Sequence, residues 1–244
     1  MRVAVVSTPR SGNMWLRRLL VAAYGLEERS AHTPSEVAWD ELPGRCVLQL
    51  HWRRTPQFLA LLERHAFGVV VLARHPLDVL VSILHFAPHE PQTVRWLDGE
   101  AGDEAALDGA DPVSEAFLRY ATGPRAQALL AVTPEWWGVA DARVRYEELV
   151  AEPARELERL ADDLGAPLLV PAADAAAAVS FADLRREASN EHFWQGRPGL
   201  WRHLLPADVA HAVAAAQPAV AALGYEVDAG EVTPEEARAR WAAL

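Results

Sequence analysis

The residues with the clearest chemical character form a short loop near the start of the chain. Residues 7–16 read STPRSGNMWL; they follow an apolar run at residues 3–6 and open a segment with apolar periodicity. A strand that turns tightly into a helix leaves the first helical N–H groups unpaired, where the helix dipole also favours an anion. Gly12 lets the backbone approach that anion, Arg10 adds a permanent cation and Ser11 adds a hydroxyl. The pattern predicts a cradle for phosphate or sulfate.

The cradle differs from the two common nucleotide-binding motifs, because neither G-x-x-x-x-G-K-[ST] nor G-x-G-x-x-G occurs in the chain. A second segment, residues 74–82, reads RHPLDVLVS and also follows an apolar run, at residues 69–73. Pro76 stands where a helix would start. Arg74 is therefore expected at the end of another strand, with Ser82 on the helix that follows.

These two segments resemble the signature of the sulfotransferases that use 3′-phosphoadenosine 5′-phosphosulfate (PAPS). The family's 5′-phosphosulfate loop reads [TY]-P-[KR]-S-G-[TN]-T-W-[LV], which residues 8–16 match except at Met14. Its 3′-phosphate motif, R-x-P-x-D-x-x-x-S, is similar to residues 74–82. Three further segments resemble family motifs. Residues 135–137 with 144–153 resemble E-W-W with Y-E-D-[LM]-x-x-[DN]-P, and residues 179–184 resemble T-S-F-x-x-[ML]. Residues 196–202 resemble the end of R-K-G-x-x-G-x-W-[KR]. The matches occur in the family's order over residues 8–202.

The resemblance implies a role for each matching residue. In the family a histidine at the end of the second strand deprotonates the acceptor, and His51 matches it; imidazole suits this role because its pKa lies near neutral. Arg10 matches a loop lysine that contacts the phosphosulfate and steadies the departing phosphate. His51 and Arg10 are therefore the expected catalytic residues. The residues expected to bind PAPS are Arg10, Ser11, Gly12, Asn13, Met14, Trp15, Arg74, Ser82, Tyr146, Phe181 and Gly196.

Within this set, the resemblance assigns different parts of the nucleotide to different side chains. Trp15 matches a tryptophan that stacks on adenine, while Tyr146 and Phe181 match residues that line the base. Arg74 and Ser82 match the ligands of the 3′-phosphate.

The chain departs from the family pattern at three places. Gln49 replaces a lysine two residues before the histidine, and Met14 replaces a threonine whose hydroxyl touches the phosphate. The Trp-Gln pair at residues 194–195 replaces the Arg-Lys pair that grips the 3′-phosphate. Arg197 and Arg202 are the nearby cations that would have to compensate.

These motifs require a sheet that brings strand ends together. Apolar runs predict strands over residues 2–6, 46–50, 68–73 and 142–146, and apolar periodicity predicts helices over residues 14–24, 57–64 and 206–223. Strands that alternate with helices indicate a parallel sheet whose ligands sit at the carboxyl ends of the strands. The predicted fold class is α/β, a P-loop-type parallel sheet of about four to five strands flanked by helices. A single sulfotransferase domain, residues 1–244, is expected.

Residues 87–112 are expected to form a long loop, since they combine proline, glycine and many acids. A loop of this length in a compact domain is usually functional or mobile. Two interpretations stay open, a lid over the acceptor and a solvated acidic insertion. The acids are Glu90, Asp98, Glu100, Asp103, Glu104, Asp108 and Asp111.

The charge of the chain limits its partners. The formal net charge is −11, whereas a nucleic-acid or anionic-membrane partner needs a basic face, so neither partner is expected. All 23 basic residues are arginine, which excludes chemistry on a lysine Schiff base. Any anion site must be built locally from placed arginines and backbone amides.

Cysteine and histidine usage indicates no metal and no disulfide. Cys46 is the single cysteine. His85 and His89 are four residues apart with Glu90 beside them, but Pro88 interrupts the helix that would align them, and the family uses no metal. The first apolar run is too short for a signal peptide and no ~20-residue apolar span exists. A cytoplasmic protein, monomeric or homodimeric, is expected.

The sequence therefore predicts transfer of a sulfuryl group from PAPS to a hydroxyl of a small molecule, with no metal. One alternative is a kinase-like phosphoryl transferase on a related P-loop fold, which needs a Walker lysine and a carboxylate that holds Mg²⁺. Another is a nucleotide-binding module without turnover, which the changes at Gln49 and residues 194–195 keep open.

Overall fold

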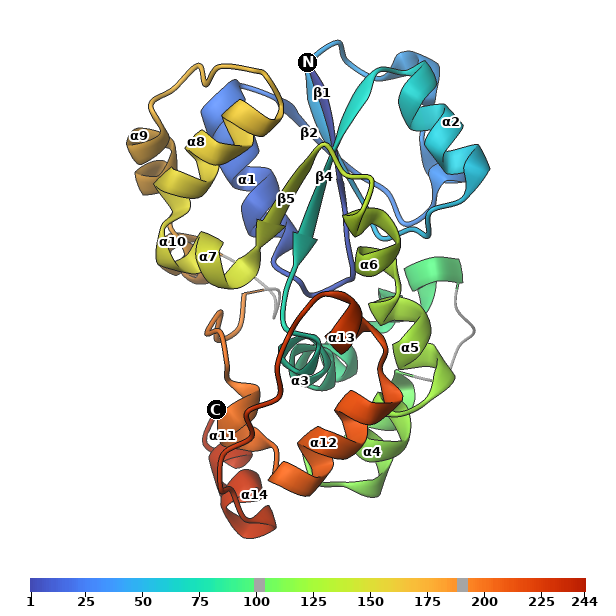
Figure 1. Cartoon of the computed structure of the whole chain (residues 1–244), viewed down its shortest axis with the longest axis vertical. Coiled ribbons are helices and arrows are strands. Elements are labelled where there is room, and N and C mark those ends of the chain that lie inside the picture. The colour runs from blue at the N-terminus through green and yellow to red at the C-terminus, as the bar shows by residue number, and fades with distance from the viewer. Residues whose placement is uncertain (99–103, 188–192) are drawn as a thin grey trace.

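Five parallel strands form the sheet of this computed structural model, which describes residues 1–98, 104–187 and 193–244 (Figure 1). The strands are β1 (Arg2–Val6), β2 (Glu27–Ser30), β3 (Cys46–Leu50), β4 (Phe67–Ala73) and β5 (Ala142–Arg145). Their order across the sheet is β2-β3-β1-β4-β5. The strand order reverses at β1, and ligands in such sheets bind beside that reversal, at the carboxyl ends of the strands.

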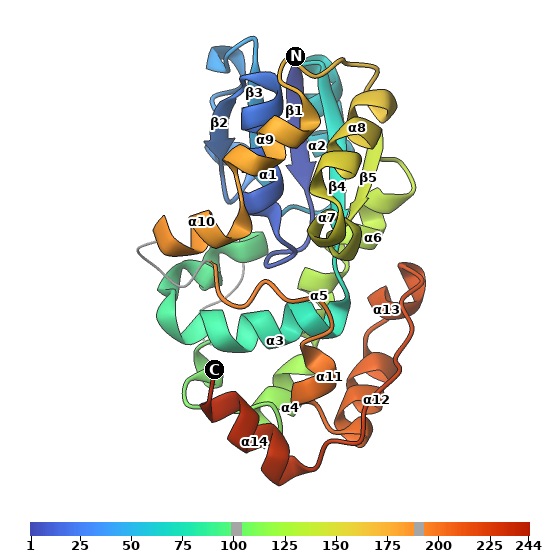
Figure 2. The same cartoon turned by 90° about the vertical axis from the view of Figure 1, so that its left-hand side faces the viewer.

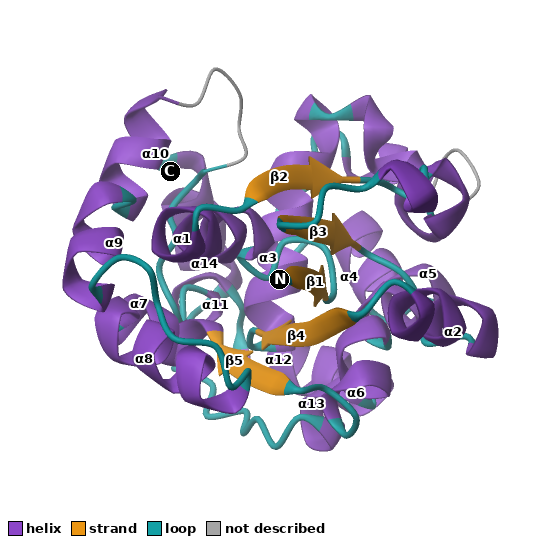
Figure 3. Cartoon of the chain, turned by 90° about the horizontal axis from the view of Figure 1, so that it is seen from above, coloured by secondary structure: helices purple, strands orange, loops and turns teal. Residues whose placement is uncertain are grey.

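Helices cover both faces of the sheet (Figure 3). On one face lie α1 (Asn13–Tyr24), α8 (Pro153–Asp163) and α9 (Ala172–Ala178), and on the other lie α2 (Pro56–Arg64) and α6 (Val132–Trp137). Successive residues of a strand point to opposite faces, so the central strands must be apolar throughout. In β1, Val3 and Val5 pack toward α1, while Ala4 and Val6 pack toward α2.

A second group of helices lies beyond the carboxyl ends of the strands (Figures 1 and 2). At its centre α3 (Pro76–Phe86) runs beneath the sheet, and its apolar side chains share one core with those of the neighbouring helices. These neighbours are α4 (Glu115–Ala121), α5 (Pro124–Leu130), α11 (Trp201–Leu204), α12 (Ala207–Ala216), α13 (Ala219–Ala222) and α14 (Pro234–Ala242).

Short helices complete the connections near the strand ends. The α-helices are α7 (Tyr146–Ala151), directly after β5, and α10 (Phe181–Glu187). The 3-10 helices are η1 (Pro34–Glu36), η2 (Trp39–Glu41), η3 (Ala87–His89), η4 (Pro91–Asp98) and η5 (Ala105–Leu107). No helix among the residues described is long and apolar enough to span a membrane.

The predicted α/β class and parallel sheet are confirmed, with two differences in the elements. The prediction missed β2, whose sequence EERS has no apolar residue; it is an edge strand, held by backbone pairing with β3. The prediction of one helix over residues 206–223 was wrong, because the chain breaks between α12 and α13 at Gln217. Pro218 lacks an N–H and pushes the preceding residue out of the helical region, and Gln217 has φ −114° and ψ 94°.

The acidic segment also differs from the predicted loop. Its described residues form η3, η4 and η5 rather than one irregular stretch. Glu104 is not solvated but buried, and it accepts hydrogen bonds from Arg125 Nε at 2.8 Å and Tyr120 Oη at 3.0 Å. The acids Glu100 and Asp103 lie outside the described residues.

Candidate active site

The loop between β1 and α1 turns through two residues with positive φ, Arg10 at 64° and Gly12 at 101°. A Cβ atom on Gly12 would lie 2.5 Å from the ring of Tyr146. Position 12 therefore requires glycine for two reasons: its backbone has a positive φ, and the Tyr146 ring fills the space that a Cβ would need. Helix α1 begins at Asn13, so its first backbone N–H groups have no carbonyl within the helix and sit at the positive end of its dipole.

Side chains hold this loop in place from both ends. The Asn13 amide donates to the Thr8 carbonyl at 3.0 Å, and the Ser7 hydroxyl bonds the Asn13 side-chain oxygen. The Thr8 N–H donates to Thr133 Oγ1 at 2.9 Å, and the Thr8 hydroxyl donates to the Leu129 carbonyl at 3.1 Å. The Asn13 side chain thus supports the loop.

Arg10, Arg74 and Ser82 form a connected group. Arg10 Nε donates to Ser82 Oγ at 3.1 Å, and Arg74 Nη1 donates to the Arg10 carbonyl at 3.1 Å. The guanidinium of Arg74 lies 4.6 Å from the ring centre of Tyr146, and that of Arg10 lies 4.0 Å from the ring centre of Phe86. Within the described residues the buried Nε of Arg74 has no hydrogen-bond partner.

Three aromatic rings meet beside this group. Trp15 packs edge-on against Tyr146 and Phe181, with ring centres 6.3 and 5.9 Å apart, and its Nε1 donates to the Val179 carbonyl at 2.9 Å. Tyr146 Oη donates to the Gly196 carbonyl at 2.8 Å. Gly196 has φ 63°, and a Cβ there would lie 2.3 Å from the Phe181 ring. The glycine lets the chain pass directly against the aromatic residues.

The segment after Gly196 is fixed to helix α3 by one carboxylate. Asp78 accepts from the backbone N–H of Gly199 at 2.6 Å and from that of Trp201 at 3.0 Å. The helix that carries Ser82 thereby also positions the last matching motif of the sequence.

His51 follows the carboxyl end of β3 and is held as a neutral imidazole. Its Nδ1 lies 2.8 Å from the Ser7 carbonyl, which can only accept, so Nδ1 carries the proton. Burial lowers the pKa of His51 to about 4, against an ordinary value of 6.5. Nε2 therefore presents a lone pair, and the Gln49 side-chain amide donates to it at 3.2 Å.

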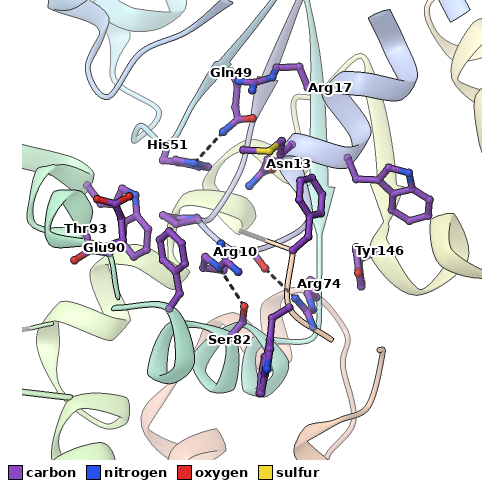
Figure 4. Close-up of a pocket in the computed structure, with 18 of the residues that line it drawn as sticks. Arg10, Asn13, Arg17, Gln49, His51, Arg74, Ser82, Glu90, Thr93 and Tyr146 are labelled. Atoms are coloured by element: carbon purple, nitrogen blue, oxygen red, sulfur yellow. Dashed lines mark hydrogen bonds between the residues drawn. The ribbon is translucent and has the colours of Figure 1, made fainter. Parts of the chain in front are cut away.

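A cavity of about 380 Å³ joins these features (Figure 4). In this view His51 and Gln49 lie above Arg10, and Ser82 lies below it. Arg74 and Tyr146 lie to the right of Arg10. Of the residues expected at the site, those that line the cavity are Arg10, Gly12, Asn13, Met14, Trp15, His51, Arg74, Ser82, Tyr146, Phe181 and Gly196. Ser11 is 1% exposed and is not among the described residues that line it.

Sequence reasoning did not find the other wall of the cavity. Glu36, Glu90, Thr93 and Arg95 line it, and Arg17 lines it while paired with Glu28 at 2.5 Å. None of these residues lies in a recognisable motif, and Glu90 was noted only for the acidity of residues 87–112 and for its place beside His85 and His89.

The Trp-Gln pair that replaces the family's cations lies at the cavity, since both Trp194 and Gln195 line it. Trp194 lines the cavity and stacks on His85, with ring centres 4.1 Å apart. Arg197 bonds the ring of His203 at 2.9 Å, and Arg202 Nε donates to the Asp228 carbonyl at 3.1 Å. Neither arginine is among the described residues that line the cavity.

The histidines with metal-like spacing, His85 and His89, lie close to each other. The rings of His85 and His89 are 5.5 Å apart, and one face of His85 is covered by Trp194. Across the described parts of the chain, no group of three His, Cys, Asp or Glu side chains is placed to hold a metal ion.

Known structures share this architecture. The chain is similar to the mouse sulfotransferase SULT7A1 complexed with PAP, at 18% identity and a TM-score of 0.64, over 88% of this chain and 82% of that one. It is also similar to retinol dehydratase, at 16% identity over 96% of this chain and 83% of that one. The TM-score is 0.58 for its complex with androsterone and PAP and 0.59 for its complex with retinol and PAP. No protein-family model and no curated protein sequence matches the chain.

These similarities define the class of protein by its fold. The chain has the fold of the PAPS-dependent sulfotransferases, a parallel five-stranded sheet flanked by helices. Residues from several of the segments that resemble the family's motifs, among them Arg10, Arg74 and Tyr146, line one cavity of that fold.

Proposed function

We propose that this protein is an enzyme that transfers a sulfuryl group from PAPS to a hydroxyl of a small-molecule acceptor. One observation carries the proposal: the anion cradle, Arg74, Ser82 and a neutral histidine all open on the same cavity. The residues come from different strand ends, and no one of them would suggest sulfuryl transfer alone. Residues 1–244 would act as one sulfotransferase domain.

The cavity suits a nucleotide that carries an anionic group at both ends. The N–H groups at the start of α1 and the Arg10 guanidinium would hold the 5′-phosphosulfate. Arg74 and Ser82 would hold the 3′-phosphate, and the buried Arg74 Nε that lacks a partner within the described residues suits an anionic ligand. The adenine would contact Trp15, Tyr146 and Phe181.

The reaction needs a proton acceptor and a cation. PAPS supplies the sulfuryl group. As the acceptor oxygen forms its bond to sulfur, His51 Nε2 takes the hydroxyl proton, and the acceptor displaces the Gln49 amide from that nitrogen. The bond between sulfur and the 5′-phosphate oxygen breaks and its electron pair remains on the phosphate. Arg10 and the α1 amides stabilise that growing charge, and adenosine 3′,5′-bisphosphate (PAP) is left.

Two changes from the family pattern shape this site. Gln49 offers a neutral amide where the family has a lysine, so Arg10 would be the main cation at the reacting group. Trp194 offers an indole where the family has an arginine, so Arg74 would carry more of the recognition of the 3′-phosphate. A nucleotide-binding module without turnover is the alternative that these changes favour.

Turnover tests the proposal. The protein is incubated with PAPS, EDTA and a panel of hydroxylated acceptors, and release of PAP is measured; PAP binding is measured by calorimetry in the same buffer. Binding with turnover is expected. Binding without turnover on any acceptor supports the non-catalytic alternative, and absence of PAP binding rejects the site. Phosphoryl transfer from ATP with Mg²⁺, without sulfuryl transfer, would instead support the kinase-like alternative.

Substitution of His51 tests its role. His51→Ala is expected to lower kcat by ~10²- to ~10⁴-fold, the usual contribution of a positioned base. The Kd of PAP should change little, because His51 would contact the acceptor rather than the nucleotide. His211→Ala, an exposed histidine on α12, is the matched control. A His51→Ala variant that keeps most of its rate would make His51 a structural residue.

A further inference from the structure

The cavity has a polar end that lies away from the nucleotide-binding motifs. Figure 4 shows Glu90 and Thr93 on one side of Arg10, opposite Arg74 and Tyr146. His32 and Glu36, from the segment after β2, also line the cavity, as do Gln92 and Arg95 of η4. These side chains offer carboxylate, amide, hydroxyl, imidazole and guanidinium groups.

An ion pair organises this polar end. Arg95 Nη2 lies 2.5 Å from Glu36 Oε1, and the His32 N–H donates to Glu36 Oε2 at 2.9 Å. The pair therefore joins the segment after β2 to η4, which lie far apart in the sequence. Since both charges already have partners, Glu36 and Arg95 neutralise each other to first order.

The polar end is anchored to the helical core. Arg125 of α5 donates to the Trp96 carbonyl at 2.9 Å and to the Thr93 carbonyl at 3.4 Å, both in η4. Arg125 is in turn held by the buried carboxylate of Glu104 at 2.8 Å. These bonds fix the backbone of η4, so the polar wall is formed before an acceptor binds.

Glu90 adds a negative charge to this wall that the pair of Glu36 and Arg95 does not balance. Glu90 Oε1 accepts from the Gln92 N–H at 3.0 Å, and within the described residues Glu90 forms no ion pair. An acceptor with a cationic group would pair with Glu90, whereas an anionic acceptor would be repelled.

An apolar acceptor fits this wall poorly for a different reason. It would cover the polar groups of Gln92 and Glu90, which are not buried, without replacing their bonds to water. Each polar group left unpaired in this way lowers the affinity by roughly tenfold. A molecule with hydroxyl and amine groups replaces those bonds instead.

We infer that the acceptor is a hydrophilic molecule that bears several hydroxyl groups and an amine, as amino sugars do, with Glu90 as the partner of the amine. This inference names the substrate class of the proposed sulfuryl transfer and rests on that function. It assigns Glu90 a role in specificity.

Binding to the protein–PAP complex tests the class of acceptor without requiring turnover. Calorimetry at mildly acidic pH compares the linear glucosamine trisaccharide, cellotriose and naphthol. Cellotriose differs from the first by hydroxyls in place of amines, and naphthol is an apolar phenol. The glucosamine trisaccharide is expected to bind at least about tenfold more tightly than cellotriose, and cellotriose at least about tenfold more tightly than naphthol.

A charge-removing substitution tests the role of Glu90. Glu90→Gln keeps the size of the side chain, and it should reduce the preference for glucosamine trisaccharide over cellotriose from about tenfold to under about threefold. Glu158→Gln, an exposed glutamate on α8, makes the same charge change far from the cavity residues and should keep the preference.

The outcomes separate this inference from the function on which it rests. Binding of the glucosamine trisaccharide without any turnover upholds the acceptor class and contradicts sulfuryl transfer. Turnover of naphthol with better kcat/KM than either sugar upholds sulfuryl transfer and overturns the acceptor class. Absence of sugar binding, or an unchanged preference in Glu90→Gln, also overturns the inference.

Discussion

At the scale of single residues, surroundings decide what His51 can do. The Ser7 carbonyl fixes the proton on Nδ1, and burial keeps the imidazole neutral by lowering its pKa to about 4. Those two effects leave a lone pair on Nε2 that faces the cavity beside Gln49. A general base must be unprotonated before it acts, and this environment keeps His51 in that state across the physiological range.

The lowered pKa predicts the pH dependence of the reaction. Protonation of His51 removes the base, and with a pKa of about 4 this happens only in acid. The rate is therefore expected to stay level as the pH falls through 6.5, the ordinary histidine pKa, and to decline near the lowered value. A profile of kcat/KM against pH measures this. An acid limb centred at 6.5 would show that His51 is not the base or is not buried when it acts.

Arg74 is expected to bind the 3′-phosphate of the nucleotide. A hydrogen bond to a charged group contributes ~1.5 to ~3 kcal/mol, so Arg74→Ala should weaken PAP binding at least about tenfold. Binding of adenosine 5′-monophosphate, which lacks the 3′-phosphate, should hardly change. Calorimetry with both ligands measures the difference.

Arg197→Ala is the matched control for Arg74, since Arg197 bonds His203 and is not among the described residues that line the cavity. It should leave PAP binding unchanged. Equal loss of both ligands in Arg74→Ala would mean that Arg74 supports the loop through the Arg10 carbonyl rather than recognising the phosphate.

At the scale of elements, the turn from β1 into α1 makes the cradle. Gly12 starts the helix with a positive φ, and the Tyr146 ring occupies the space where a side chain would go. Strand β5 and helix α7 supply that ring, so the cradle is shaped by an element far along the chain.

Replacement of Gly12 should therefore abolish nucleotide binding. Gly12→Ala combines a strained backbone with a contact of 2.5 Å to Tyr146, so either the loop or the ring must move. Calorimetry with PAP is expected to show no binding. Thermal unfolding in the same buffer reports whether the variant is folded.

Gly25 is the matched control at the other end of α1. It has φ 59° but no atom within 4 Å of an added Cβ. Gly25→Ala should lower the free energy of unfolding by only about 1 kcal/mol and leave PAP binding intact. If Gly12→Ala binds PAP as well as Gly25→Ala does, the cradle does not depend on the close packing of Tyr146.

At the scale of the whole molecule, the site connects the sheet to the helices beyond it. Arg10 follows β1, Arg74 follows β4, Ser82 lies on α3, and Gly196 precedes a segment that Asp78 fixes to α3. A nucleotide held by all of them would bind only the folded chain. Its binding should then stabilise the fold as a whole.

PAP is therefore expected to raise the melting temperature in the presence of EDTA. A ligand at about a hundred times its Kd adds ~2.7 kcal/mol to the free energy of unfolding, or roughly 5 to 10 °C for a chain of this size. Differential scanning calorimetry measures the shift. A shift that appears only when Mg²⁺ is added would contradict a metal-free site.

The sequence alone predicted the parallel sheet, because its central strands β1 and β4 are buried on both faces and consist almost entirely of apolar residues. The strand-turn-helix pattern also predicted the anion cradle, and the resemblance to the sulfotransferases suggested His51, Arg74 and Ser82 as site residues. The sequence did not predict β2, whose pairing is made by backbone groups that any side chain permits.

Tertiary structure alone decided how these residues are used. The neutral state of His51 depends on burial and on the Ser7 carbonyl, and the support role of the Asn13 side chain depends on where Thr8 lies. No sequence motif marks the polar wall that contains Glu36 and Arg95, because its residues meet only when distant segments pack together. Local sequence specifies elements and the residues at their ends, whereas charge state and contact depend on neighbours that the fold brings from elsewhere in the chain.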